Sequence, residues 1–244
     1  MKYNFPQFLI SRATLSIMLK QSIALLTFCL ISLPCFAQED QVSLQFVAFP
    51  KTANAEPVEL LVGSGETLLV ELPTNSLSPI YKVNRLSQWA LGKSSTGDEN
   101  EFVFETYGKA PSHASANQLI LVLRKGPNDS DGFDLIPLDN QQSAFGGGKY
   151  FFMNAAKVDI AVEMGDKKFA LKPLQHKLVE PEPSKVEGER KYLYVYLHFR
   201  KGEEAVPFYS STWRYSEKAR GMIFFYHDTH TKQLRTHTIR DYIE

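Results

Sequence analysis

Short apolar segments recur along the chain from about residue 40 onward. Val42–Val47 alternates between apolar and polar residues, Val58–Val62 is mostly aliphatic, and Thr67–Leu72 follows the Gly63–Gly65 turn. Runs of this length with branched or aromatic side chains, bounded by turn residues, are typical of strands. No window of about 11 residues in this part of the chain keeps a helical apolar period. The pattern therefore predicts an all-β protein.

Ten further segments have the same character. They are residues 101–107, 118–124, 133–138, 149–154, 158–164, 168–171, 177–180, 192–200, 221–227 and 234–240. Strands spaced at roughly 8–12 residues, with turns between them, favour a sandwich or a barrel. The proline-containing stretch 180–190 has little apolar content and is expected to be an exposed loop.

The two halves align with each other at an offset of about 100 residues. Val58–Gly63 matches Val158–Glu163, and Gln118–Leu123 matches Gly221–Tyr226. Phe133–Asp139 matches Leu234–Asp241 in outline. A repeat at a fixed offset indicates a duplicated unit, although two unrelated sandwiches would also share some of these generic patterns. We expect two tandem antiparallel Ig-like β-sandwiches, residues 39–144 and 145–244, joined by a polar segment and then a glycine-rich one.

Residues 1–37 have the pattern of an export signal. Three basic residues and no acidic ones precede the apolar run Ile23–Leu33, which is too short to span a bilayer. Ala37 has the small side chain expected at a cleavage site. Translation could start at Met1 or at Met18, since either leaves a basic segment before the apolar run. We expect residues 1–37 to be a signal peptide and the mature chain to be periplasmic or secreted.

Removal of the signal changes both the cysteine count and the net charge. Cys29 and Cys35 both lie within it, so no disulfide is expected afterwards. The remaining chain has 24 Lys and Arg residues against 27 Asp and Glu residues, a net charge of about −3. Without a basic excess, nucleic acid is not an expected partner. The remaining chain also has no apolar run long enough for a transmembrane segment.

One apolar strand has tyrosines at every second position. Residues 192–200 alternate so that Tyr192, Tyr194 and Tyr196 share a face opposite the aliphatic residues. Rigid amphipathic rings in a row, with Trp213 close by in sequence, could bind a glycan or a protein partner. The same tyrosines could instead pack against cross-strand neighbours.

A polar cluster near the C-terminus is the candidate metal site. It consists of His227, Asp228, His230 and His237. Imidazole and carboxylate groups bind a transition metal only if they converge, and here no zinc-binding spacing supports convergence. The alternative is a solvated hairpin loop.

No catalytic residue is singled out, because the chain after residue 37 lacks cysteine and has no nucleophile elbow.

Several segments of the second half carry a family resemblance. They are Tyr150–Ile160, Leu171–Pro173, and Trp213–Arg220 followed by Met222–Tyr226. In these segments the chain resembles uncharacterised secreted bacterial proteins that contain a repeated Ig-like β-sandwich. The resemblance covers most of the second half, extends loosely to the first, and implies fold and export but no activity.

Together these features predict an exported module of the cell envelope that binds a ligand or has a structural role. We expect it to be non-catalytic and to need no cofactor, with an envelope protein or a glycan as its partner. Two alternatives stay open. One is a glycan-binding module that uses the tyrosine face, and the other is a metal-dependent hydrolase at the histidine loop.

Overall fold

The computed structural model describes residues 40–51, 56–228 and 231–243. His230 lies outside these residues. In chain order the elements are β1 (Gln41–Phe49), β2 (Val58–Gly63), β3 (Glu66–Val70), β4 (Tyr81–Asn84), β5 (Gln88–Thr96), η1 (Asp98–Asn100), β6 (Phe102–Pro111), β7 (Asn117–Arg124), η2 (Asp129–Asp131), β8 (Phe133–Asp139), α2 (Gln142–Phe145), β9 (Tyr150–Asn154), β10 (Ile160–Met164), β11 (Lys167–Leu171), β12 (His176–Val179), β13 (Lys185–Glu187), β14 (Arg190–Lys201), β15 (Glu204–Tyr215), β16 (Ala219–His227) and β17 (Leu234–Tyr242).

The described strands form four open sheets. Sheet A has the order β4-β1-β7-β8, and sheet B the order β3-β2-β5-β6. Sheet C has the order β12-β9-β16-β17. In sheet D the order is β11-β10-β14, with β13 and β15 also paired to β14. The predicted mostly β structure with several antiparallel sheets is therefore confirmed.

The expected antiparallel pairing is wrong for two pairs of neighbouring strands. β1 runs parallel to β7 in sheet A, and β9 runs parallel to β16 in sheet C. A parallel pair needs a long connection between its strands. Here the connection contains the strands of the other sheet together with one edge strand of the same sheet, β4 in sheet A and β12 in sheet C. The pairing therefore depends on contacts distant in sequence.

The second half repeats the strand order of the first. β13 has no counterpart in the first half, and once it is left out of the numbering sheets A and C have the same strand order. The hairpins β2-β3 and β5-β6 then correspond to β10-β11 and β14-β15. A bulge also recurs in the same hairpin, because Tyr107 in β6 and Phe208 in β15 each lack a direct partner on the preceding strand.

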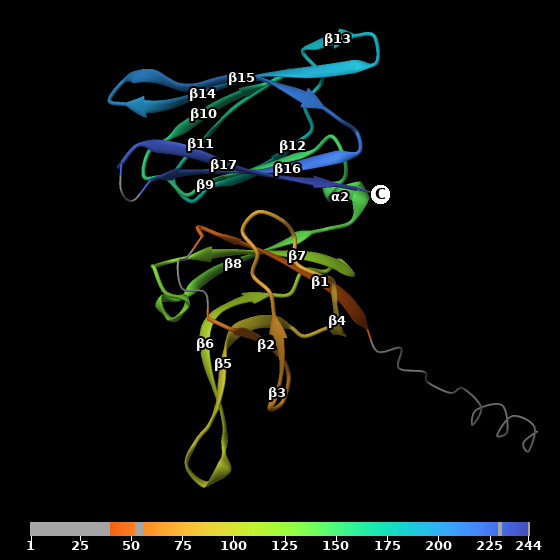
Figure 1. Cartoon of the computed structure of the whole chain (residues 1–244), viewed down its shortest axis with the longest axis vertical. Coiled ribbons are helices and arrows are strands. Elements are labelled where there is room, and N and C mark those ends of the chain that lie inside the picture. The colour runs from red at the N-terminus through yellow and green to blue at the C-terminus, as the bar shows by residue number, and fades with distance from the viewer. Residues whose placement is uncertain (1–39, 52–55, 229–230, 244) are drawn as a thin grey trace, which may run out of the picture. The chain divides into compact units, whose positions relative to one another are not determined.

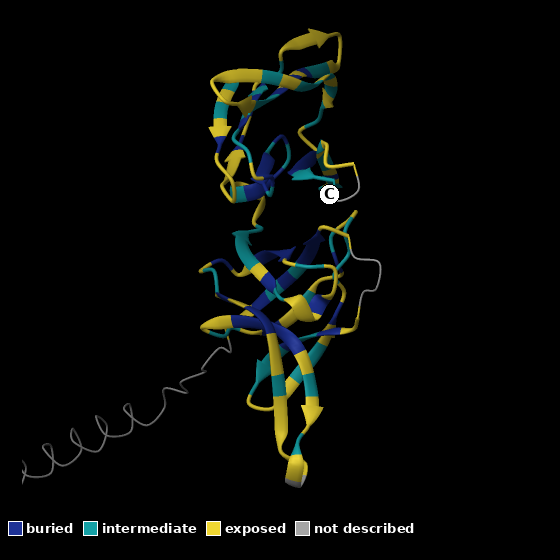
Figure 2. Ribbon diagram, turned by 90° about the vertical axis from the view of Figure 1, so that its left-hand side faces the viewer, coloured by how far each residue is buried: buried dark blue, intermediate teal, exposed yellow. Residues whose placement is uncertain are grey.

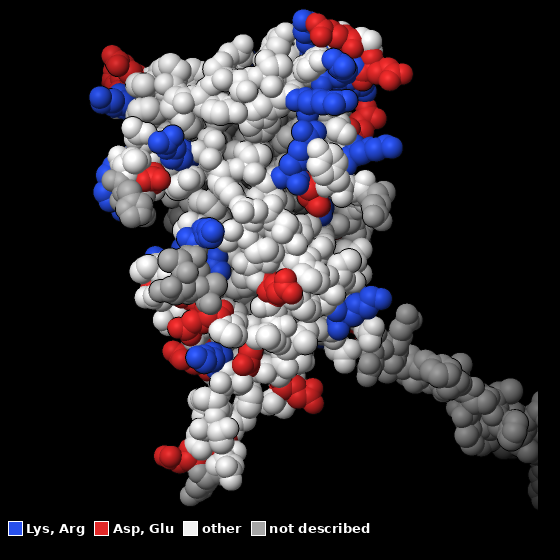
Figure 3. Space-filling view, viewed as in Figure 1, with Lys and Arg blue, Asp and Glu red and all other residues white. Residues whose placement is uncertain are grey.

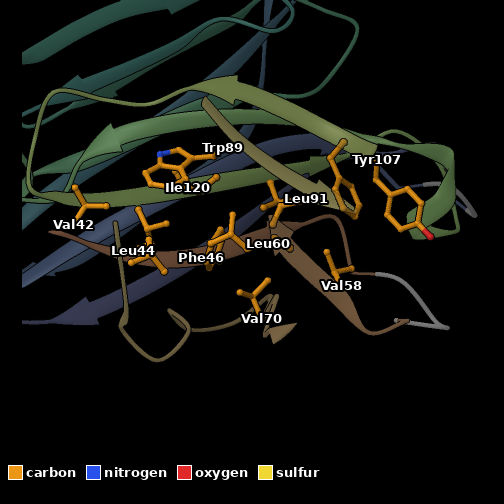
Figure 4. Close-up of a cluster of buried hydrophobic side chains, with 14 residues drawn as sticks. Val42, Leu44, Phe46, Val58, Leu60, Val70, Trp89, Leu91, Tyr107 and Ile120 are labelled. Atoms are coloured by element: carbon orange, nitrogen blue, oxygen red, sulfur yellow. The ribbon is translucent and has the colours of Figure 1, made fainter. Parts of the chain in front are cut away.

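The sheets stack in the order B, A, C and D (Figure 1). One core lies between sheets A and B and includes Trp89, Phe46 and Leu60 (Figure 4). A second core lies between sheets C and D. A third lies between sheets A and C, where Phe49, Leu121 and other side chains of the first half contact Phe224 and its neighbours in the second.

Central strands of the two inner sheets are therefore buried on both faces (Figure 2). Every residue of β7 from Gln118 to Arg124 is buried, and so is every residue of β16 from Ala219 to Phe225. Strands covered on both faces have continuous apolar runs rather than alternation, which explains the runs Leu119–Leu123 in β7 and Met222–Tyr226 in β16. The residues from Asp40 onward form one compact unit.

The segment between the halves is anchored to the second half. Residues 142–145 form the short helix α2, and Phe145 is buried. The guanidinium of Arg220 lies 4.6 Å from the centre of the Phe145 ring and donates a 2.6 Å hydrogen bond to the Phe145 carbonyl. Gly148 takes the left-handed conformation with φ +77°, a position that favours glycine.

Candidate binding site

The outer face of sheet D carries the tyrosine row of β14. Leu193, Val195 and Leu197 of this strand are fully buried in the core between sheets C and D. Tyr194 and Tyr196, on the opposite face, are 38% and 43% exposed. The alternation expected from the sequence is present, and two of the three tyrosines meet solvent. Tyr192 is half-buried.

Strand pairing places polar side chains around the exposed rings. Tyr196 lies opposite Glu163 of β10 on one side and Ser210 of β15 on the other. Tyr194 lies opposite Thr212 of β15. Residues directly opposite each other share a face of the sheet. Both tyrosines are therefore flanked by a short hydroxyl side chain on the β15 side, and Tyr196 is flanked by a carboxylate on the β10 side.

Beside Tyr194 and Tyr196 the surface is hollowed into an open depression of about 410 Å³. Besides the two rings, the side chains that line it include those of Glu163, Asp166, Lys168 and Glu182. Small-molecule sites combine apolar rings with a few placed polar groups. This depression has both, and it is open rather than enclosed.

The 165–166 turn and the 182–184 segment build the wall of the depression. Gly165, at φ +59°, donates its N–H to the Tyr194 carbonyl at 3.2 Å. A side chain at Gly165 would lie 2.2 Å from the Glu182 carbonyl, so only glycine fits. Asp166 accepts a 2.7 Å hydrogen bond from the Glu182 N–H, and Ser184 Oγ accepts one of 3.0 Å from the Tyr194 N–H. These bonds attach the 182–184 segment to the 165–166 turn and to the strand that carries the tyrosines.

The charges of the depression are partly paired. Lys168 forms an ion pair with Glu163 at 2.8 Å, and Lys167 forms one with Asp166. The hydrogen bond from Lys167 lowers the pKa of Asp166, and the Glu182 N–H acts in the same direction. Ionised carboxylates accept hydrogen bonds only. The depression therefore offers acceptors for hydroxyl groups beside two aromatic faces.

Trp213 does not belong to this site. It lies directly opposite Leu193, so it is on the inner face of sheet D, whereas Tyr194 and Tyr196 are on the outer face. Its ring packs against the core between sheets C and D, and its Nε1–H donates to the Tyr209 hydroxyl at 2.9 Å. The expected combination of the tyrosines with Trp213 is therefore not formed.

A larger depression, of about 600 Å³, lies beside the edge strand β12. It is lined mainly by the 177–183 segment, with Lys167 and Tyr215. Burial raises the pKa of the Tyr215 hydroxyl. Tyr215 is the one aromatic residue in this lining, whereas two tyrosines line the smaller depression. The larger depression therefore has less aromatic surface for a flat ligand to stack on.

The candidate metal ligands are separated by the sheet. His237 lies opposite Phe224, on the face of sheet C that meets sheet A. His227 is an odd number of residues from Phe224 along β16 and therefore lies on the other face. The Asp228 carboxylate accepts a 2.7 Å hydrogen bond from the Thr231 N–H within the turn.

His237 instead joins the two halves. Its ring is 5.7 Å from the Phe49 ring and 6.2 Å from the Phe224 ring, and its Nε2–H donates to the Thr74 carbonyl at 2.8 Å. Among the described residues no three His, Cys, Asp or Glu side chains are close enough to hold a metal ion. His237 is thus a packing residue that the sequence pattern could not distinguish from a ligand.

Comparisons with known proteins do not assign the chain to a family. No family model matches the chain, and no curated protein matches it. In the described part of the chain, no helix is long and apolar enough to span a membrane.

Proposed function

We propose that this chain is an exported, non-catalytic binding module of the cell envelope, periplasmic or secreted, and that it binds a glycan at the outer face of sheet D. The observation that carries the proposal is the exposure of Tyr194 and Tyr196 side by side along β14. Sugar rings have apolar C–H faces and polar edges. Aromatic rings can cover the faces, while neighbouring carboxylates and hydroxyls accept or donate at the edges.

The second part of the proposal concerns the architecture of the chain. We propose that it consists of two tandem β-sandwiches derived from one duplicated unit, since the strand order and the bulge recur in both halves. Immunoglobulin domains place their first, second, fifth and fourth strands in one sheet. Here the first, fourth, seventh and eighth strands of the first half share a sheet, as do their counterparts in the second half, so we propose a pair of sandwiches without the immunoglobulin strand order.

A binding experiment with single tyrosine variants tests the glycan assignment. Purified residues 38–244 are titrated with hexasaccharides of β-1,4-linked glucose and N-acetylglucosamine and with soluble peptidoglycan strands, by calorimetry. We expect at least one of them to bind, and Tyr194→Ala and Tyr196→Ala each to weaken binding roughly tenfold, because each removes an aromatic face.

Tyr242→Ala is the matched control. Tyr242 is 70% exposed on β17 and does not line the depression. The Tyr242→Ala variant should bind the glycan with the same affinity as the parent chain. Equal losses in all three variants, or no binding to any of the glycans, would contradict the proposal, and release of shorter sugars would contradict its non-catalytic part.

A further inference from the structure

The β5-β6 hairpin of the first half leaves part of its outer strand without a neighbour. β6 is the last strand of sheet B and, among the described strands, pairs only with β5. From Tyr107 onward its open side is covered, because a side chain at Gly108 would lie 2.7 Å from the Phe133 carbonyl and the Tyr107 and Phe133 rings are in contact. No described strand pairs with the open side of Phe102–Thr106.

This open segment displays apolar side chains to solvent. Phe102 and Val103 are 41% and 42% exposed, and the rings of Phe102 and Phe104 stack at 6.5 Å. Because side chains alternate along a strand, Phe102 and Phe104 share one face while Val103 and Glu105 share the other. Figure 1 shows the hairpin projecting beyond the stacked sheets, and Figure 2 shows that its tip is not buried.

Acidic residues surround the apolar ones. Glu66, Asp98, Glu101 and Glu105 are exposed, and none of them is in an ion pair between described residues. Lys93, directly opposite Glu105, pairs with Glu56 at 3.5 Å. On the face shown in Figure 3, acidic and uncharged atoms occupy the projecting tip. The edge is therefore apolar and negatively charged.

The equivalent strand of the second half provides an internal comparison. Relative to the shared bulge, Thr106 of β6 corresponds to Pro207 of β15. A proline removes a backbone donor and protects an edge strand against further pairing. The aromatic residues Phe102 and Phe104 correspond to Glu203 and Ala205. The fold thus requires neither the aromatic side chains nor an unprotected edge at this place.

We propose that the Phe102–Thr106 edge binds an extended segment of a partner protein by strand addition, and that this segment alternates apolar and basic residues. Main-chain hydrogen bonds supply affinity in this mode, and alternate side chains supply specificity. Apolar residues of the incoming strand lie beside Phe102 and Phe104, and basic residues lie on the face of Glu105. A second copy would present the same acidic residues, and like charges opposite each other destabilise a sheet pair.

The test uses a capped peptide of alternating lysine and valine, labelled for fluorescence anisotropy, and its glutamate-valine counterpart. We expect the lysine peptide to bind and to slow hydrogen exchange at residues 102–106, and the glutamate peptide to bind at least tenfold more weakly. Glu101→Lys combined with Glu105→Lys should reverse this preference. Thr106→Pro should abolish binding of both peptides while leaving the unfolding midpoint nearly unchanged, because β15 has proline at the equivalent position.

Glu203→Lys combined with Glu204→Lys places the same charge change on the equivalent hairpin and should leave peptide binding unchanged. Equal binding of both peptides, protection at another strand, or binding that survives Thr106→Pro would overturn the proposal. So would self-association of the protein that Thr106→Pro abolishes, since the occupant would then be a second copy.

Discussion

Replacing Asp129 with alanine is expected to lower the free energy of unfolding by about 3–5 kcal/mol, because it leaves the buried charge of Arg124 without its carboxylate partner. The Arg124 Nε lies 2.7 Å from Asp129 Oδ1, and the two side chains are 2% and 0% exposed. Asp129 also accepts a hydrogen bond from the Glu56 N–H at 3.2 Å. Urea unfolding followed by circular dichroism measures the loss.

An exposed ion pair of the same region is the matched control. Lys125 and Asp134 lie 2.8 Å apart, but their side chains are 51% and 59% exposed. Asp134→Ala should therefore cost less than about 1 kcal/mol. The double variant Arg124→Met with Asp129→Leu should be more stable than Asp129→Ala, because it removes both charges. If Asp129→Ala cost no more than Asp134→Ala, the assigned role of the buried pair would be wrong.

Most strands could be predicted because their side chains either alternate between apolar and polar or form a continuous apolar run of strand length. The segments 118–124 and 221–227 were expected within two residues of their observed bounds, Asn117–Arg124 and Ala219–His227. The strands that sequence reasoning missed are β4, β5, β13 and β15. β5 ends in the polar run Lys93–Thr96, and β15 contains Pro207, so neither has a clear apolar period. β13 lies in the stretch expected to be a loop.

The stacking of sheet A on sheet C could not be predicted from the sequence pattern. It depends on parallel pairing between strands far apart in the chain, such as Phe46 with Ile120. A local pattern indicates that a strand is buried on both faces, but not which sheet covers the second face. The duplication suggested two cores, and the structure adds a third between the halves.

Register decided which predicted site residues could act together. The tyrosines of β14 are on one face because they are two residues apart, and this follows from the sequence alone. Trp213 lies on another strand, so its face depends on the pairing Leu193–Trp213. His227 and His237 are an even number of residues apart, yet the hairpin pairs His227 with Leu234 and so puts the two histidines on opposite faces. Only the paired strands reveal such a difference.

The contact between sheets A and C should make the two halves unfold together. Phe224 is fully buried there, and its ring stacks on that of Phe49 at 4.8 Å. Phe224→Ala should lower the free energy of unfolding by about 3–5 kcal/mol. It should also separate the unfolding of the halves, because the side chain it removes belongs to the core that they share.

The two tryptophans report each half independently, since Trp89 lies in the first core and Trp213 packs on the second. Fluorescence melts of Trp213→Phe and Trp89→Phe chains should have coincident transitions with Phe224 intact, and distinct midpoints with Phe224→Ala.

Phe225→Ala is the control. Phe225 is equally buried and adjacent, but it faces the core between sheets C and D. Its loss should destabilise the protein by a similar amount while the two transitions stay together, because the shared core is unchanged. Separate transitions in the parent chain, or separation by Phe225→Ala alone, would show that the A–C contact does not couple the halves.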